Sequence, residues 1–194
     1  LTPEQERLLE LTYRNFIRSG AALSAEKQER FREINQRLSV LSLQFGQNVL
    51  GEVNNYKLVI DKEADLAGLP RSSVDMAAEQ AAAEGLSGKW VFTLHNPSVM
   101  PFLSYAENRE LRRTMQQAYV NRGNNNNAFD NKAIIGEMVN LRLERARLLG
   151  YDSHAAYVLE ENMAQNIPTV NDFLKKLWDA ALPIAREEAA MMQQ

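Results

Sequence analysis

The two histidines, His95 and His154, are the residues best suited by type to acid–base or metal chemistry. A hydrolytic zinc site of the HExxH kind needs two histidines at positions i and i+4 on one helix, with a glutamate between them to activate water. Here His95 is followed by Asn96, and His154 by Ala155. The sequence therefore predicts no metal ligand in this chain. We expect a cleft position for His95 and an interhelical hydrogen bond for His154.

Other reactive groups form no catalytic set either. The adjacent pairs Glu160–Glu161 and Glu187–Glu188 point in different directions on a helix, so neither pair makes a shared acid–base site. The chain has no cysteine, which excludes a thiol nucleophile, a thiolate metal site and a disulfide. No glycine-rich phosphate loop or GxSxG elbow is present. We therefore predict that this chain carries no catalytic residue.

Charge and composition exclude further classes. A net charge of −3 with 45% hydrophobic residues is typical of a folded protein and argues against nucleic-acid binding. Glutamates interrupt the arginine-rich stretches, which favours pairing within helices. No apolar run approaches the roughly 18 residues of a membrane span, and no secretory segment opens the chain. Because cysteine is absent, we expect the cytoplasm, with the periplasm as the alternative.

The most regular stretch runs from Asp130 to Ala164 and predicts two helices joined at Gly150. Gly150, followed by the apolar Tyr151, is typical of a Schellman helix end, and Asp152 or Ser153 is suited to cap the next helix. Apolar residues recur at helical spacing in both parts: Ile134, Met138, Leu141, Leu148, then Ala156, Tyr157, Leu159 and Met163.

Further helices are predicted on either side of this stretch. Thr2 and Pro3 open a helix that reaches Ser19, a long helix covers residues 24–54, and Asn108 caps one that reaches Arg122. A last helix begins near Thr169 and contains Pro183, which should kink it. The predicted inward residues are Leu9, Tyr13, Phe16 and Ile17; Phe31, Ile34, Leu38, Leu41 and Phe45; Leu111, Met115, Ala118 and Tyr119; and Val170, Phe173, Leu177, Trp178 and Ala181.

Residues 55–95 interrupt the helical pattern. Alternating apolar residues at Tyr56–Ile60 and Trp90–Leu94 predict two short strands, separated by an excursion helix over residues 70–84. We predict a mainly α fold, a helical lobe of long antiparallel helices with a short two-stranded β ribbon, as a single region over residues 1–194.

Several segments resemble one enzyme family. The run ERARLLGYDSHAAYVLEENMA at residues 144–164 is similar to the zinc oligopeptidases of the thimet oligopeptidase and peptidyl-dipeptidase family, peptidase family M3. The runs LSVLSLQFGQNVL (38–50), DLAGLP (65–70), GKWVFTL (88–94) and NRG (121–123) resemble its bacterial dipeptidyl carboxypeptidase branch. The resemblance lies in the order and spacing of these segments, which together cover most of the chain.

The resemblance implies a two-lobed helical enzyme with a deep channel, in which an HExxH helix and a downstream glutamate hold zinc. Its substrates would be short peptides, from which the dipeptidase branch removes C-terminal dipeptides. This chain lacks that motif, so we expect an N-terminal and middle fragment that is inactive alone and binds no zinc.

Within such an enzyme this chain would form one wall of the channel, and its partner would be the C-terminal catalytic portion of the same protein. We expect substrate-cleft residues at Trp90, Phe92, His95 and Asn96. The alternatives are a non-enzymatic helical protein-interaction module and an all-helical domain that binds a small ligand.

Overall fold

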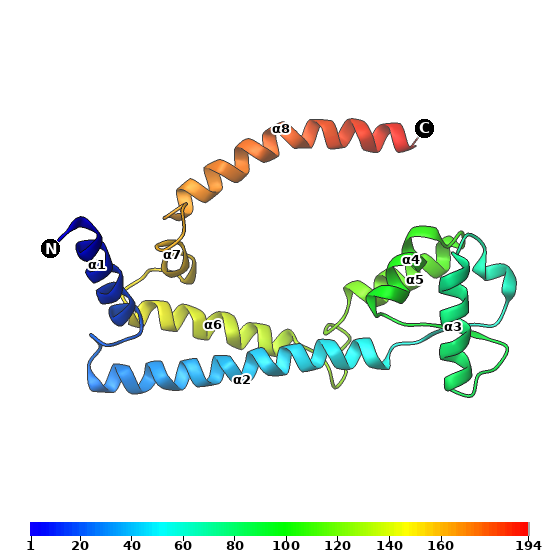
Figure 1. Cartoon of the computed structure of the whole chain (residues 1–194), viewed down its shortest axis with the longest axis horizontal. Coiled ribbons are helices and arrows are strands. Elements are labelled where there is room, and N and C mark those ends of the chain that lie inside the picture. Colours follow the sequence, from blue (N-terminus) through cyan, green and yellow to red (C-terminus); the bar gives the residue numbers. More distant parts are fainter. Residues whose placement is uncertain (194) are drawn as a thin grey trace. The chain divides into compact units, whose positions relative to one another are not determined.

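The computed structural model describes residues 1–193 and is mainly α-helical (Figure 1). The predicted mainly α fold with one small antiparallel ribbon is confirmed. None of the helices within residues 1–193 is long and apolar enough to cross a membrane. The elements are α1 (Pro3–Arg18), α2 (Ala25–Asn55), β1 (Leu58–Ile60), the 3-10 helix η1 (Glu63–Leu66), α3 (Arg71–Ala83), β2 (Trp90–Phe92), α4 (Asn96–Tyr105), α5 (Arg109–Val120), α6 (Lys132–Leu148), α7 (His154–Leu159) and α8 (Ile167–Gln193).

The chain divides into two compact units. The first unit combines Leu1–Leu38 with Met138–Gln194, and the second unit is Ser39–Glu137. Helices α2 and α6 each contribute residues to both units. The single region expected over residues 1–194 stays a prediction.

The second unit contains the ribbon. Strands β1 and β2 pair antiparallel, with Leu58 opposite Phe92 and Ile60 opposite Trp90. Helix α3 is the excursion between them, and it packs Ala77 and Ala81 into the interior. Because successive strand residues point to opposite faces, one ribbon face carries Trp90 and Phe92 and the other carries Val91. The first face covers a core that also contains residues of α4, its C-cap and α5: Val99, Phe102, Ala106 and Met115.

Helix α4 was not separately predicted. Asn96 and Pro97 are its first two residues. Proline is well tolerated there because the first turn of a helix has no intrahelical partner for its N–H groups. The predicted cap at Asn108 is confirmed, since its side chain accepts from the backbone N–H groups of Glu110 and Leu111 at 3.0 and 3.2 Å.

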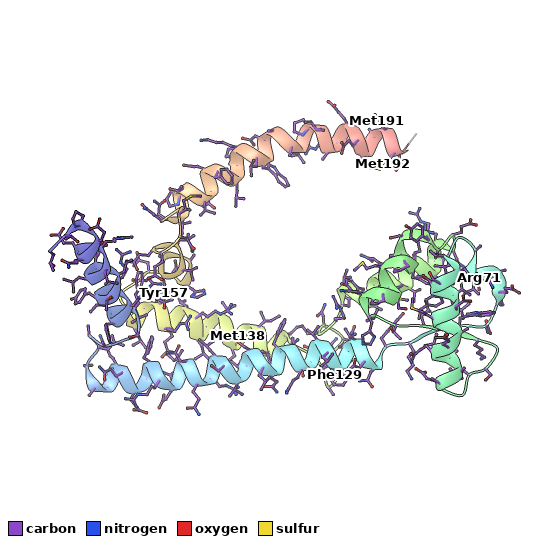
Figure 2. The ribbon with its side chains drawn as sticks, viewed as in Figure 1. Arg71, Phe129, Met138, Tyr157, Met191 and Met192 are labelled. Atoms are coloured by element: carbon purple, nitrogen blue, oxygen red, sulfur yellow. The ribbon has the colours of Figure 1, made fainter. Side chains whose placement is uncertain are left out.

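The polar loop between α5 and α6 is fastened to α2. The buried carboxylate of Glu52 accepts from the side-chain amides of Asn125 and Asn127 at 2.9 and 2.7 Å. Asn48 donates to the buried side chain of Asn131 at 2.9 Å. The ring of Phe129, labelled in Figure 2, lies so close to Gly51 that a Cβ there would stand 2.4 Å from its Cε1.

In the first unit, α2 and α6 lie side by side in opposite directions (Figure 1). Arg30 donates to both carboxylate oxygens of Glu144 at 2.7 and 2.9 Å, and Arg145 donates to Asn35 at 3.1 Å. Ile34 and Leu38, two residues of the predicted seam of α2, are buried. The antiparallel helices of the predicted lobe are therefore present.

The predicted end of α6 is confirmed in detail. Gly150 has a φ of +89°, and the N–H groups of Gly150 and Tyr151 donate to Arg147 and Ala146 at 3.0 Å each. These are the two hydrogen bonds of the Schellman motif. Ser153 caps α7 by accepting from Ala156. Helix α7 ends at Leu159, earlier than predicted, and Met163 of the expected stripe is fully exposed.

Two predicted buried faces are exposed. The inward residues predicted for α1 and α8 include Tyr13, Phe16, Phe173 and Trp178, and these four are 60–66% exposed. Helix α8 has no buried residue, and it begins earlier than predicted because Asn166, and not Thr169, supplies the cap. Of the predicted inward residues of these two helices, Ile17 and Val170 are half-buried, and most of the others are exposed. Phe45, predicted in the seam of α2, is also exposed.

Candidate functional site

A shallow depression beside the ribbon is the site that includes a predicted cleft residue. It has a volume of about 220 Å³ and lies entirely within the second unit. Residues of α3, of β2 and the segment after it, and of the start of α4 line it: Ser73, Met76, Ala77, Gln80, Val91, Thr93, His95, Pro97 and Ser98. Side-chain hydroxyl, amide and imidazole groups therefore surround an apolar floor.

His95 is held at the rim of this depression. Its Nδ1 lies 3.1 Å from the hydroxyl of Thr93, which leaves Nε2 for another partner. The backbone N–H of Thr93 donates to the hydroxyl of Ser98 at 3.0 Å, so the end of the strand is tied to the first turn of α4. His95 lies in the short segment between Thr93 and Ser98, so this contact helps to hold His95 at the rim of the depression.

The other three cleft candidates do not line this depression. Phe92 is 1% exposed, and its ring centre lies 4.7 Å from that of Phe102 in the core. Trp90 packs against the same core. Asn96 is exposed and accepts from the hydroxyl of Tyr119 at 3.4 Å. Only His95 of the four lines the depression, because Trp90 and Phe92 share the ribbon face that points away from Val91.

No part of residues 1–193 fits a zinc ion. A protein zinc site needs three or four nitrogen, sulfur or oxygen ligands in one place, and no group of three or more His, Cys, Asp or Glu side chains comes together within the described residues. No hydrolytic step can therefore be derived through a metal held by this chain.

The first unit contains a second polar cluster, around Arg18 at the end of α1. The Arg18 side chain is buried, donates to the hydroxyl of Tyr151 at 3.1 Å and to the carbonyl of Tyr157 at 2.8 Å, and pairs with Glu160 and Glu161. Hydrogen bonds from Tyr151 and Arg18 lower the pKa of Glu160. No local sequence pattern predicts this cluster, because Arg18 lies at least 133 positions from each partner.

His154 lies next to the Arg18 cluster, with its ring stacked on Tyr157 at a centroid distance of 6.2 Å. Its Nδ1 is buried and has no hydrogen-bond partner within residues 1–193, so this nitrogen does not make the interhelical hydrogen bond that was expected for His154. Burial, and then the charges of Arg145 and Arg142, lower the pKa of the imidazole. The ring packs here against Tyr157.

Comparison with known proteins identifies relatives across the whole chain. The model of peptidase family M3 matches residues 102–194. Oligopeptidase A of Haemophilus influenzae is 41% identical over 188 residues, covering 95% of this chain and 28% of that protein. Dipeptidyl carboxypeptidase of Escherichia coli is 31% identical over 193 residues, covering 100% of this chain and 28% of the relative. Saccharolysin of Saccharomyces cerevisiae is 32% identical over 192 residues, covering 98% of this chain and 26% of that protein.

The chain therefore spans less than a third of the length of these relatives. The resemblance to the M3 peptidases that the sequence motifs predicted is confirmed. Relatives named oligopeptidase A reach higher identity than those named dipeptidyl carboxypeptidase, and the expected dipeptidase branch stays a prediction.

Proposed function

Because this chain is related to the peptidases of family M3, we propose that it is the non-catalytic, channel-wall portion of a zinc-dependent oligopeptidase that hydrolyses short peptides. The zinc and the residues that activate water belong, in this proposal, to the C-terminal catalytic portion of the same protein. One observation carries the proposal. Relatives named as peptidases match 94–100% of this chain, yet residues 1–193 bring no metal-binding group together.

The depression at His95 is the part of this wall that we propose to contact peptide. Its hydroxyl, amide and imidazole groups suit the N–H and C=O groups of a peptide backbone, and its apolar floor suits a side chain. With a volume of about 220 Å³ it is smaller than the pockets of roughly 300 Å³ and more that enclose whole drug-sized ligands. It therefore receives one residue of a longer peptide. Phe92 and Trp90 support the depression from the opposite face of the ribbon.

Variants of His95 in the complete protein test this contact. Losing a group that binds the ground state and the transition state equally raises KM without changing kcat, so His95→Ala should raise KM several-fold at constant kcat. Arg71→Ala is the matched control, because Arg71 lies in the same unit with a fully exposed side chain and outside the depression (Figure 2). Equal KM values for His95→Ala and Arg71→Ala would remove His95 from the proposed peptide contact.

We also propose that the complete enzyme releases dipeptides from peptide C-termini, as the family resemblance implies. Mass spectrometry of the products from one peptide, prepared with a free and with an amidated C-terminus, tests this specificity. Stepwise loss of dipeptides from the free peptide alone is the expected result. Internal cleavage of both peptides would refute the dipeptidase specificity and indicate an oligopeptidase specificity.

We propose that the protein is cytoplasmic, with the periplasm as the alternative. Fractionation of the source cell decides between the two locations.

A non-enzymatic interaction module is the second candidate, favoured by the exposed apolar faces of α1 and α8. It predicts a stable complex with a separate protein and no peptide cleavage by the complete protein.

A further inference from the structure

Helix α8 has an apolar face that the rest of the described chain leaves uncovered. The α8 stripe consists of six residues at steps of one, three and four: Phe173, Leu174, Leu177, Trp178, Ala181 and Ile184. All six are exposed, and Trp178 is 64% exposed. An open groove of about 560 Å³ follows the middle of this stripe. In Figure 2 the labelled Met191 and Met192 lie near the C-terminal end of α8, and both side chains are exposed.

An exposed face of this kind requires a partner. Most of the stability of a protein helix comes from packing its apolar face, not from helix propensity, and contiguous apolar patches on a protein surface mark interaction sites. The opposite face of α8 is charged and carries Asp172, Lys176, Asp179 and Arg186. Lys175 and Asp179 form an ion pair of 2.9 Å on that side. The helix is therefore divided into a face suited to water and a face suited to a protein interior.

The position of Pro183 agrees with this division. Proline removes one intrahelical hydrogen bond and bends a helix. At 100° per residue Pro183 falls on the charged face of α8, close to Asp172 and Asp179, so the carbonyl that loses its hydrogen bond points toward solvent. Figure 1 shows α8 as a curved helix. Helices that cover a core curve with their convex side toward solvent, which is the arrangement that a proline on the polar face favours.

We propose that the α8 stripe is the docking surface for the catalytic portion of the same protein, and specifically for an amphipathic helix in that portion. This inference rests on the proposed function. The occupant of the α8 stripe is inferred from the relatives. Oligopeptidase A, dipeptidyl carboxypeptidase and saccharolysin match this chain over only 26–28% of their own length. The family match includes α8, since it covers residues 102–194. Most of the polypeptide of such an enzyme is therefore available to cover α8.

Glu188 adds a charge requirement for the docked helix. It lies four positions after Ile184 and seven after Ala181, on the same side of α8 as the stripe. A carboxylate that becomes covered at an interface needs a cation or several hydrogen bonds. The docked helix should therefore have an apolar face about 24 Å long, the length of about 16 helical residues, with a lysine or arginine opposite Glu188.

Hydrogen exchange of the α8 amides tests the docking directly. In the complete protein the amides of residues 173–188 should exchange on the order of 100-fold more slowly than in the separate chain 1–194, because covering a helix suppresses its local opening. Trp178→Asp in the complete protein should remove most of this protection, and Lys176→Asp, on the charged face, should keep it. Equal exchange in the complete protein and in the chain would overturn the proposal. So would protection of the chain alone that increases with its concentration, which would identify a second copy as the occupant.

Peptide cleavage measured on the same samples separates this inference from the proposed function. Protected amides in a complete protein that cleaves no peptide would leave the docking in place and refute the peptidase function. Peptide cleavage by a complete protein whose α8 amides are unprotected would support the peptidase function and refute the docking. Because the comparison of complete protein and chain uses unmodified sequence, it decides the question even where Trp178→Asp fails to fold.

Discussion

The guanidinium of Arg18 stacks on the ring of Tyr157, with its carbon 4.1 Å from the ring centre, and the same side chain donates to the Tyr157 carbonyl at 2.8 Å. These contacts join the end of α1 to α7 across 139 positions of sequence. Glu160 and Glu161 balance the buried charge. Arg18 therefore connects the N-terminal helix to the segment that follows Gly150 in the first unit.

Arg18→Ala should lower the free energy of unfolding by about 2 kcal/mol, because it removes a stacked, charge-paired group and leaves the Tyr157 carbonyl unpaired. This value lies below the range for fully buried pairs, since both glutamates are about 40% exposed. Urea unfolding measures the change. The control is Arg7→Ala, which breaks the exposed pair with Glu10 and should cost less than about 0.5 kcal/mol. Equal effects of the two variants would show that the Arg18 cluster contributes nothing beyond a surface pair.

Stability should depend on pH through Glu160. Hydrogen bonds from Tyr151 and Arg18 lower its pKa in the folded state, so the contribution of Glu160 is complete above its unfolded value near 4.5. That contribution disappears as the pH falls through the lower folded pKa. The wild-type protein should therefore exceed Glu160→Gln in stability at about pH 6, and this advantage should shrink below about pH 4.5. Urea unfolding of both proteins across this range tests the prediction, and a constant difference at all pH values would contradict it.

Gly51 and Gly46, both inside α2, should respond oppositely to alanine. A Cβ at Gly46 meets nothing within 4 Å, so Gly46→Ala should stabilise the protein by about 1 kcal/mol through helix propensity. A Cβ at Gly51 would stand 2.4 and 2.6 Å from two ring atoms of Phe129. Gly51→Ala should therefore destabilise by about 1 kcal/mol or more.

Phe129→Leu, which shortens the obstructing side chain, should recover part of the loss from Gly51→Ala. Chemical denaturation of Gly46→Ala, of Gly51→Ala and of the double variant Gly51→Ala with Phe129→Leu tests this explanation. A stabilising Gly51→Ala would show that the ring of Phe129 moves aside at no cost.

Glu52→Ala should release the polar loop between α5 and α6. It removes the acceptor of both Asn125 and Asn127, and we expect a loss of about 2 kcal/mol. Glu29→Ala, which removes an exposed carboxylate of α2 paired with Arg32, is the control and should cost less than about 0.5 kcal/mol. Hydrogen exchange over residues 124–131 should accelerate in Glu52→Ala only. Unchanged exchange there would show that the loop is held by its other contacts.

The features that the sequence predicted correctly are those with a local physical cause. Thr2 starts α1 as expected and forms a capping box with Gln5, Asn108 caps α5, and Gly150 ends α6 with two short-range hydrogen bonds. Strand alternation also predicted the pairing of β1 with β2. In each case the residues that determine the geometry lie within a few positions of each other, so their types and spacing contain the information.

The features that the sequence did not predict depend on distant parts of the chain. The Arg18 cluster brings together residues from α1 and α7, and no local pattern marks an arginine as buried. Periodicity identified the apolar faces of α1 and α8 but not whether anything covers them. Similarly, alternation placed Trp90 and Phe92 on one ribbon face, but only the position of Phe102 shows that this face is the core and that His95 lies at the other side.

Metal content and peptide cleavage, measured in parallel on the complete protein and on the chain 1–194, test the central claim most directly. The account predicts stoichiometric zinc and chelator-sensitive cleavage of a short peptide in the complete protein, with neither property in the chain alone. Zinc bound stoichiometrically by residues 1–194 together with cleavage by that chain would contradict the assignment of this region as non-catalytic. A complete protein with neither zinc nor cleavage would contradict the peptidase function and favour the interaction module.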